Sequence, residues 1–475
     1  MDFTTKKYKT NKKCMEAARE IPVYDEVDVV VAGAGLAGCC AALKAARDGA
    51  NVILIERDGI LGGVATAGLM TCITNFFFKK DGTQVVHDIV EEIVDSLTEA
   101  GAASDKWKNV EVPCIPNNSE VMQECLFKKL TEAGVRILIH TFVSDVIMEG
   151  DTARGVIIET KMGRMAIMAK VLVDSTGDAD LAYHAGAEYE YYGHDSCSTL
   201  FELANVDLDK IMKFFEEHPE NFDEQKDVAL PFETFRKNYY ERGIFHTPHG
   251  GGKKLSILQD AIKEGKWWHE KGTATKLDHF GLYATRGSNR LLVNSHFCYV
   301  DTLSDVEAHS YAELESRLFC IQLAKLMTER MPGCENAYLS RISTTMGVRL
   351  TRNIIGDIYL TLDDVKVNRK YNNVIFRTPI LYKKREDGKD LGLRLYNETI
   401  GIPVEVLIPK NVDNIVIGTG KCISADRQSR QEFLRGQMNT MLFGVAAGKI
   451  AAEAVRQNKS IKIMDVTTIT SSNFA

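Results

Sequence analysis

The chain has 475 residues, 45% hydrophobic and 26% charged, which is the composition of a globular protein with room for more than one domain. A net charge of −7 argues against a nucleic-acid-binding protein, and no run of about 18 apolar residues predicts a membrane span. Its 11 cysteines include no C-x-x-C spacing, which argues against a disulfide framework, a metal site or an iron–sulfur cluster. We therefore expect a metal-free cytoplasmic protein whose residues 1–20 form a basic tail.

The first part of the chain alternates strands and helices. Residues 27–31 predict a buried strand, residues 38–48 an Ala-rich helix that stops at Gly49, and residues 51–56 a second strand. A helix with Ser119 or Asn117 as its N-cap then precedes a third strand, "VRILIH". Residues 142–173 predict three antiparallel strands, which form a β-meander.

The pattern Gly33-x-Gly35-x-x-Gly38 joins the first strand to the first helix. Glycines at such a turn leave room for a pyrophosphate, which the backbone N–H groups and the helix N-terminus can hold. Glu56 ends the second strand, where a carboxylate binds the adenosine ribose and repels the 2′-phosphate of NADP. The following loop contains Gly62-Gly63, which suits the passage of a longer cofactor. Together these features favour FAD over NAD and NADP.

The later part of the chain has a different residue composition. Residues 186–404 are rich in Tyr, His, Phe and Trp and predict an α+β cap or substrate domain. Parallel-strand character returns with "NIVIGTGK", followed by a long helix over residues 437–456. We therefore predict an α/β fold, in which a Rossmann-like FAD-binding domain with a parallel sheet and an antiparallel β-meander is built from residues 21–185 and 405–460, and the cap is inserted.

Five blocks in order carry a resemblance to a known family: "REIPVYDEVDVVVAGAGLAG", "LIERDGILGGVATAGLM", "AKVLVDSTGDADLAYHAGA", "GVRLTRNIIGDIYLTLDDV" and "VLIPKNVDNIVIGTGKCISA". They resemble the FAD-dependent oxidoreductase family with a glutathione-reductase-like FAD domain, distantly akin to the flavoprotein subunits of succinate dehydrogenase and fumarate reductase. The resemblance covers about residues 19–457 and implies the fold and FAD as cofactor. It leaves the substrate open, because the family is broad in substrate.

The resemblance also implies roles for individual residues. The backbone of Val143 would meet adenine, Thr176-Gly177-Asp178 would be the turn where the meander returns, and the final helix would aim its N-terminus at the flavin pyrimidine ring. Lys421 follows Gly420 where the family often has Arg or Asp. The implied cofactor-binding residues are Gly33, Gly35, Leu36, Ala37, Gly38, Glu56, Arg57, Gly62, Gly63, Val143, Thr176, Gly177, Asp178, Gly420, Arg435 and Met438.

Candidate catalytic residues come from the cap and the later blocks. Arg349 and Arg352 could bind a substrate carboxylate or support the flavin, and structural ion pairs are the equal alternative. His246 and His249 in "FHTPHGGGKK" could act as a general base, or the segment could be a polar turn. His296 could face the flavin or be a core histidine.

We therefore expect an enzyme that moves a hydride between a small polar substrate and flavin N5. The substrate would be a hydroxy acid, a sugar or related alcohol, or an activated C=C. The alternatives are an FAD-containing electron-transfer subunit of a larger complex and a flavin monooxygenase. We expect a small-molecule substrate and no nucleic-acid or membrane partner; an electron-acceptor protein and a homo-oligomer stay open.

Overall fold

The computed structural model describes residues 12–193, 195–222, 231–247, 255–267, 281–295, 298–303, 305–381 and 395–470. Its main sheet has seven strands, five of them parallel in the order β5-β2-β1-β8-β21. The long strand β8 continues into the antiparallel meander β8-β7-β6, as the sequence predicts. The strands are β1 (Val23–Ala32), β2 (Val52–Ile55), β5 (Arg136–Leu138), β6 (Phe142–Glu149), β7 (Thr152–Thr160), β8 (Gly163–Asp174) and β21 (Ile415–Ile417).

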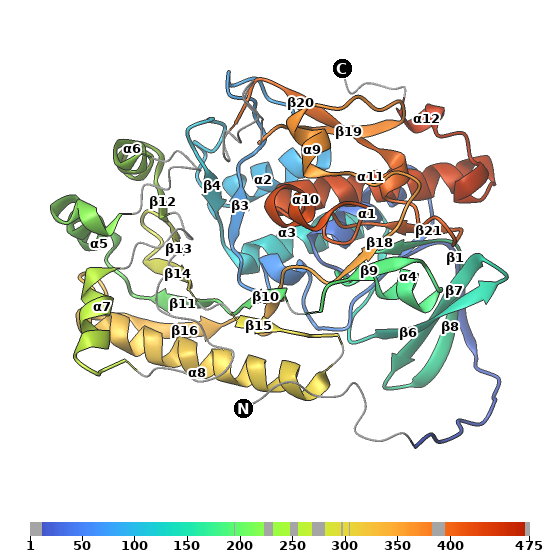
Figure 1. Cartoon of the computed structure of the whole chain (residues 1–475), viewed down its shortest axis with the longest axis horizontal. Helices are drawn as coiled ribbons and strands as arrows, with labels where there is room; N and C mark the ends of the chain where they lie inside the picture. The colour runs from blue at the N-terminus through green and yellow to red at the C-terminus, as the bar shows by residue number, and fades with distance from the viewer. Residues whose placement is uncertain are drawn as a thin grey trace.

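Two helices lie side by side against this sheet, α1 (Leu36–Arg47) and α11 (Gln437–Gln457) (Figure 1). They approach closely because α11 presents glycines at the contact. A Cβ at Gly444 would lie 2.1 Å from the Ala37 carbonyl oxygen, and one at Gly448 would lie 2.3 Å from that of Ala41. The predicted long helix is confirmed, and its small residues serve helix–helix packing beside the sheet.

Two helix starts differ from the sequence-based expectation. Helix α1 begins at Leu36 rather than at Gly38, because Gly35 in an extended conformation already ends the turn. Helix α3 (Ser119–Glu132) has Asn118 as its N-cap, so Ser119 and Asn117 were the wrong choices. The Asn118 side-chain oxygen accepts hydrogen bonds from the backbone N–H groups of Glu120 (2.8 Å) and Val121 (3.3 Å).

The cap is built on an antiparallel sheet of five strands in the order β12-β13-β14-β11-β16. One of its faces packs on a hydrophobic cluster that includes Phe215, Phe245 and Phe319. The cap strands are β11 (Phe201–Ala204), β12 (Ile244–Thr247), β13 (Gly281–Thr285), β14 (Arg290–Asn294) and β16 (Tyr338–Ile342), and the cap helices are α5 (Leu208–Glu217), α6 (Phe232–Arg242), α7 (Ser256–Lys263) and α8 (Val306–Arg330).

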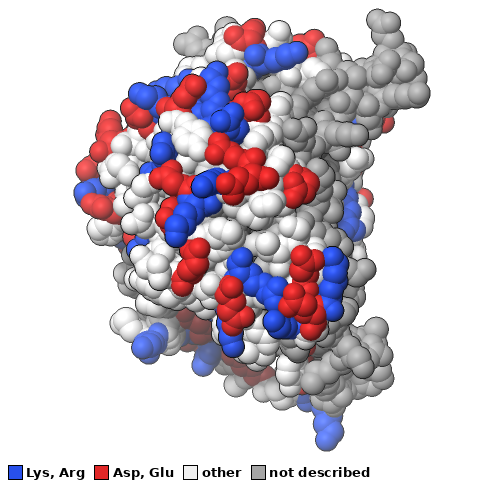
Figure 2. Space-filling model, turned by 90° about the vertical axis from the view of Figure 1, so that its left-hand side faces the viewer, with Lys and Arg blue, Asp and Glu red and all other residues white. Residues whose placement is uncertain are grey.

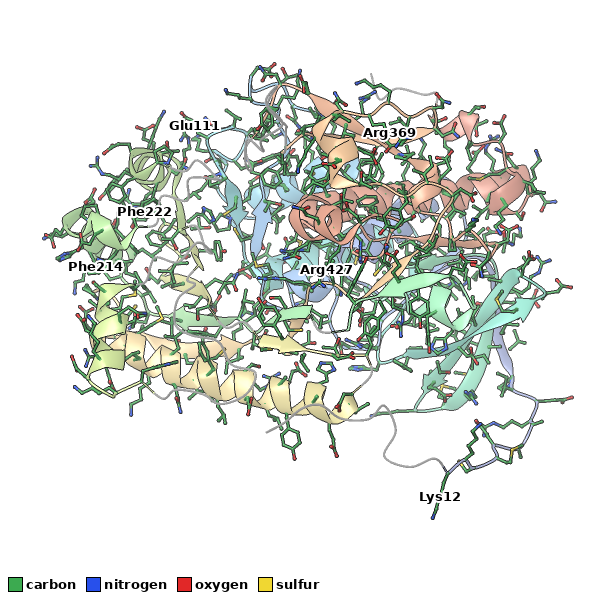
Figure 3. All side chains as sticks on the ribbon, viewed as in Figure 1. Lys12, Glu111, Phe214, Phe222, Arg369 and Arg427 are labelled. Carbon is green, nitrogen blue, oxygen red and sulfur yellow. The ribbon has the colours of Figure 1, made fainter. Side chains whose placement is uncertain are left out.

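Further helices and strands complete the two parts of the chain. Glu111, in the loop before β4, forms ion pairs with Lys237 (3.0 Å) and Arg242 (2.5 Å) of α6 and so ties the loop to the cap (Figure 3). These elements are β3 (Cys72–Thr74), β4 (Cys114–Pro116), β9 (Tyr189–Tyr191), β10 (Asp195–Ser198), β15 (Cys298–Val300), β17 (Gly347–Val348), β18 (Arg352–Ile354), β19 (Val374–Pro379), β20 (Thr399–Pro403), α2 (Asp88–Glu99), α4 (Asp180–His184), α9 (Leu362–Lys366), α10 (Arg427–Ser429) and α12 (Thr467–Thr470).

The hydrophobic cores follow the two sheets. The cap cluster runs from Phe201 to Cys334, whereas buried residues from Ile354 onward cluster with the main sheet. The predicted domain boundaries, 21–185 and 405–460 against 186–404, stay a prediction. On the cap face with α5 and α6, basic and acidic side chains are intermixed (Figure 2). Among the described residues, none of the helices is both long and apolar enough to cross a bilayer.

Candidate functional site

The glycine turn, residues Gly33–Gly38, lies at the carboxyl end of β1 and is closed on its inner side. Gly33 has φ +89°, and a Cβ there would lie 2.4 Å from the Ser175 carbonyl oxygen. A Cβ at Gly38 would lie 1.8 Å from the Gly33 oxygen, whereas one at Gly35 would meet nothing within 4 Å. The turn is therefore packed against the sheet and open on the side of Gly35.

The open side of the glycine turn offers backbone donors to a ligand. Gly35 is the N-cap of α1, and no side chain caps this helix. Its first N–H groups therefore have no intrahelical partner and can bind an anion. The Gly62-Gly63 loop closes over the turn, because Gly62 N–H donates to the Ala34 oxygen (2.7 Å) and Gly35 pairs with Gly62 in a β-bridge. This arrangement fits the pyrophosphate of a dinucleotide.

Glu56 is buried beside the same turn, 8% exposed. Its carboxylate accepts hydrogen bonds from the backbone N–H groups of Ala34 (2.7 Å) and Asp58 (3.0 Å), and burial raises its pKa. The carboxylate therefore holds the turn in place, and its predicted contact with ribose stays a prediction. Arg57 is exposed and 3.8 Å from Asp58, and Val143 is half-buried on β6.

A charged cluster follows the carboxyl end of β8. The Asp178 carboxylate accepts hydrogen bonds from Lys421 Nζ (3.0 Å) and Thr351 Oγ1 (2.8 Å). Burial would raise the pKa of Asp178, but the charge of Lys421 and these hydrogen bonds hold it below its ordinary value. Arg352 donates to the Asp178 carbonyl oxygen (2.8 Å) and to Asp180 Oδ1 (2.7 Å), so it belongs to this cluster.

The turn at Thr176 is fixed by a buried carboxylate. Asp174 ends β8 and accepts hydrogen bonds from Thr176 Oγ1 (2.7 Å) and the Ala182 N–H (2.9 Å). Burial raises the pKa of Asp174 to about 6. Gly177 is left-handed, with φ +88°, which lets the chain turn from β8 toward α4.

The N-terminus of α11 meets β3 and carries buried polar atoms without partners. Gly436 is its N-cap, and no side chain caps the helix. The Gln437 amide nitrogen donates to the Met70 oxygen (2.6 Å), while Gln437 Oε1 and Thr74 Oγ1 are buried and make no hydrogen bond with any described residue. Because buried polar atoms rarely lack partners, these two fit a bound polar ring system.

The other predicted residues near this helix differ in their surroundings. Met438 is fully buried in its first turn. Arg435 donates to the Gln431 carbonyl oxygen (2.7 Å). A Cβ at Gly420 would lie 2.3 Å from the Leu434 oxygen, so Gly420 is needed for packing against the segment before α11. Their roles toward a cofactor stay predictions.

The cap sheet turns one face toward the FAD-binding part. His246 lies opposite Tyr283, Tyr283 opposite Leu292, and Gly281 opposite Asn294 in the strand register. Residues opposite each other share a face, so His246, Tyr283, Leu292 and Asn294 form one surface, which we call the inner face. Tyr283 and Leu292 pack there with Leu69, Cys72 and Cys114, so the inner face lies against β3 and β4.

Several polar atoms of the inner face lack partners. The His246 ring stacks on Tyr283 with centroids 5.2 Å apart, and burial lowers its pKa to about 4. Within the described part of the chain, its buried Nδ1 makes no hydrogen bond, and neither does the buried Oδ1 of Asn294 or, directly after the strand, the buried Oγ of Ser295. Sequence analysis did not select Asn294 or Ser295; two polar residues directly after the apolar run "LLV" were the available signal.

Arg349 and Arg352 have separate surroundings. Arg349 follows β17, donates to Ser196 Oγ (2.8 Å), and lies near enough to Tyr283 for its charge to lower the pKa of that phenol, which burial raises. Arg349 is therefore next to the inner face, while Arg352 lies with Asp178 and Asp180. The remaining predicted histidines, His249 and His296, lie outside the described residues.

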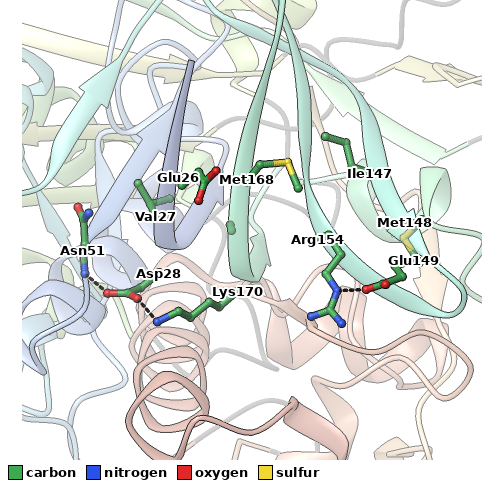
Figure 4. A pocket seen from close by; sticks show the side chains of 11 residues that line it. Glu26, Val27, Asp28, Asn51, Ile147, Met148, Glu149, Arg154, Met168 and Lys170 are labelled. Atoms are coloured by element: carbon green, nitrogen blue, oxygen red, sulfur yellow. Dashed lines mark hydrogen bonds and ion pairs between the residues drawn. The ribbon is translucent and has the colours of Figure 1, made fainter. Parts of the chain in front are cut away.

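A hollow of about 770 Å³ lies elsewhere, on the amino-terminal side of β1 and β2. Figure 4 shows its ion pairs, Asp28 with Lys170 (2.8 Å) and Glu149 with Arg154 (2.8 Å). None of the predicted site residues lines this hollow. Because ligands of open α/β sheets bind at the carboxyl ends of the strands, we assign the candidate site to the glycine turn and the inner face.

Comparison with known families decides the class of the protein. A family described as FAD dependent oxidoreductase matches residues 28–472. This chain belongs to the FAD-dependent oxidoreductase family. The predicted family of FAD-dependent oxidoreductases, with FAD as its cofactor, is thereby confirmed, and the observed sheets confirm the predicted α/β fold with its meander.

Individual relatives of this oxidoreductase match it only in part. A urocanate reductase of Eggerthella lenta is 42% identical over 94 residues, 19% of this chain and 15% of its own. A digeranylgeranylglycerophospholipid reductase 2 of Methanothermobacter thermautotrophicus is 27% identical over 40% of this chain and 50% of its own. A thiamine thiazole synthase of Methanococcus maripaludis is 31% identical over 34% of this chain and 59% of its own. The chain thus spans less than two thirds of each of these relatives.

Among solved structures, one similar protein is a geranylgeranyl bacteriochlorophyll reductase-like protein from Thermoplasma acidophilum. It is 13% identical with a TM-score of 0.47, and the alignment covers 91% of this chain and 80% of that one.

Proposed function

We propose that this flavoprotein transfers a hydride to or from a small polar substrate held between the inner face of the cap sheet and the N-terminus of α11. One observation carries the proposal. Buried polar atoms without partners belong to both surfaces, Thr74 and Gln437 on one side and His246, Asn294 and Ser295 on the other. The described residues include 17 such atoms, and these five belong to two surfaces that β3 connects. Cys72 of β3, two residues before Thr74, packs with Tyr283 of the inner face, and this grouping supports a ligand site.

The cofactor would be held mainly by backbone groups. The N–H groups at Gly35 and Leu36 would bind the pyrophosphate, and Glu56 has lone pairs left for the ribose after its two backbone hydrogen bonds. The uncapped N-terminus of α11 would stabilise negative charge on the pyrimidine ring. When bound, FAD supplies an N5 atom that accepts or donates a hydride.

The substrate would be oriented by side chains of this chain. Arg349 carries a positive charge beside Tyr283 and would bind a carboxylate or another anionic group. Asn294 and Ser295 would donate or accept hydrogen bonds to its polar groups. His246 is neutral near pH 7, because burial lowers its pKa to about 4. It is therefore a weak base at that pH, and its Nδ1 would serve as a hydrogen-bond acceptor.

Two relatives are reductases by name, which favours reduction as the direction of the reaction. Among the predicted substrates this favours an activated C=C that carries an anionic group. The electron-transfer subunit and the monooxygenase stay predictions. In both of them, and in the reduction of a C=C, an external electron donor must first reduce the flavin.

The test is a set of anaerobic reactions with the purified FAD-loaded protein. The chemically reduced protein is mixed with unsaturated and saturated carboxylates, and the oxidised protein with hydroxy acids, alcohols and sugars. We expect an unsaturated carboxylate to reoxidise the reduced flavin. The proposal is contradicted if no compound exchanges electrons with the flavin while a partner protein or oxygen with an aromatic substrate does.

A further inference from the structure

The longest cap helix, α8, is apolar on two opposite sides. One side packs into the cap core through Phe319, Leu323 and Met327, each fully buried. The other side faces outward and carries four large apolar side chains in an unbroken stripe. Their exposed fractions are 43% for Tyr311, 60% for Leu314, 53% for Leu318 and 48% for Ile321.

The spacing of this stripe is that of a helix–helix contact. The four residues follow one another by three, four and three positions, which is the repeat that keeps a seam on one side of a helix. A helix that is apolar on both sides is normally covered on both sides. A contiguous apolar patch on a protein surface marks an interaction site.

We propose that the outward face of α8, defined by Tyr311, Leu314, Leu318 and Ile321, joins two copies of this chain around a two-fold axis with the helices antiparallel. A two-fold axis level with residue 316 places Leu314 opposite Leu318 of the second copy. The same axis places Tyr311 opposite Ile321. Every apolar residue of the stripe thus meets another apolar residue, as an isologous interface requires.

Charges beside the stripe obey the same symmetry. Glu307 lies near the start of α8 and Lys325 near its end, and both are exposed. An axis level with residue 316 sets Glu307 of one copy against Lys325 of the other, twice in the dimer. A parallel arrangement would instead set like charges against each other, which is unfavourable.

The sequence of the helix favours a second copy over other occupants. A bilayer surface is bound by helices whose polar side is mainly basic, whereas acidic residues (Glu307 and Glu315) and basic residues (Arg317 and Lys325) occur together beside this stripe. A different protein would not need the stripe to be complementary to itself. The stripe is on the side of α8 opposite the residues that pack into the cap core, and α8 itself lies along the outside of the cap, next to β16 (Figure 1). A dimer through the stripe therefore leaves the inner face of the cap sheet unaffected.

The first test is the mass of the full FAD-loaded chain in solution, measured by sedimentation velocity over a range of micromolar concentrations. We expect a dimer for the natural sequence and a monomer for the double variant Leu314→Glu/Leu318→Glu. Phe127→Glu is the matched control, since Phe127 is an apolar residue of α3 with 55% exposure. The control is expected to remain a dimer, and FAD content reports whether each variant folds.

The second test reverses charges and does not disturb the apolar stripe. Glu307→Lys alone is expected to raise the dimer dissociation constant by about tenfold, and Glu307→Lys/Lys325→Glu to restore it. A monomeric natural chain would overturn the proposal, as would a dimer that Leu314→Glu/Leu318→Glu leaves intact. Failure of the double reversal to restore the dimer would overturn the antiparallel arrangement of the two helices. None of these outcomes depends on the substrate.

Discussion

The glycine turn after β1 and the inner face of the cap sheet offer a ligand different kinds of groups. The turn offers backbone N–H groups, and it requires glycine for two different reasons. A Cβ at Gly38 would overlap the backbone, whereas a Cβ at Gly35 would occupy the open space beside the turn. The inner face offers side chains, among them His246 and Asn294, on strands that pair with β13 through backbone hydrogen bonds. The cofactor site is thus set by backbone geometry and the substrate site by residue identity.

The substitution in the glycine turn with the largest expected effect on stability is at Gly38. Gly38→Ala is expected to lower the free energy of unfolding by about 3 kcal/mol, because its methyl group would overlap the Gly33 carbonyl. Gly35→Ala is the matched variant, with a methyl group in open space and a φ of −64° that alanine adopts readily. It should cost less than about 1 kcal/mol in stability but weaken FAD binding by about tenfold or more.

Urea unfolding of the apoproteins and equilibrium dialysis of FAD measure these two effects. Equal loss of stability in Gly35→Ala and Gly38→Ala would contradict the closed and open sides of the glycine turn.

The ion pair of Lys421 and Asp178 tests whether a side chain from the segment after β21 stabilises the fold. Lys421→Met leaves the Asp178 carboxylate without its cation and should lower the free energy of unfolding by about 2 kcal/mol. Lys170→Met removes a pair of similar length, 2.8 Å, whose lysine is 58% exposed, and should cost no more than about 0.5 kcal/mol. Chemical denaturation checks both, and indistinguishable midpoints would show that the Lys421 pair stabilises nothing.

Glu56 combines both kinds of contribution, because its side chain holds the backbone of the glycine turn in place. Glu56→Ala removes the acceptor of the Ala34 N–H and should weaken FAD retention by about tenfold, with about 1 kcal/mol lost in stability. Glu56→Gln retains one carbonyl oxygen and should lose less. Fluorescence of released FAD measures retention. Unchanged retention in Glu56→Ala would make the predicted ribose contact unimportant.

A pH dependence at Asp174 tests the burial of the carboxylate that ends β8. Burial raises its pKa from 3.8 to about 6, so the folded chain binds this proton more tightly than the unfolded chain does. The contribution of Asp174 to stability is therefore greatest below pH 3.8 and falls as the pH rises through about 6. Unfolding at several pH values should show that Asp174→Asn gains stability relative to the natural chain as the pH rises across this interval. A constant difference would exclude the shift.

The FAD-binding part was predictable because its constraints are local in sequence. A strand, three glycines, a helix and a carboxylate occur within Val27–Glu56, and the fold sets them in the predicted β-α-β arrangement. The inner face was not predictable in the same way. His246, Tyr283 and Asn294 are brought together by strand pairing between distant segments, and no local period reveals which residues lie opposite one another.

The two arginines show the same limit. Arg349 and Arg352 are three residues apart and look equivalent in "GVRLTRN", yet Arg349 lies near Tyr283 while Arg352 pairs with Asp180. Only the placement of β17 and β18 in different sheets separates them.

The most direct test of the central claim compares the natural chain with Asn294→Leu in anaerobic single-turnover reactions. Leucine has about the size of asparagine but cannot form the hydrogen bonds of the buried amide. We expect Asn294→Leu to bind FAD as tightly as the natural chain and to exchange electrons with the substrate at least about tenfold more slowly, or with a KM raised to that extent. Loss of FAD from this variant, or an unchanged reaction with the substrate, would contradict a substrate site on the inner face that is separate from the backbone site for FAD.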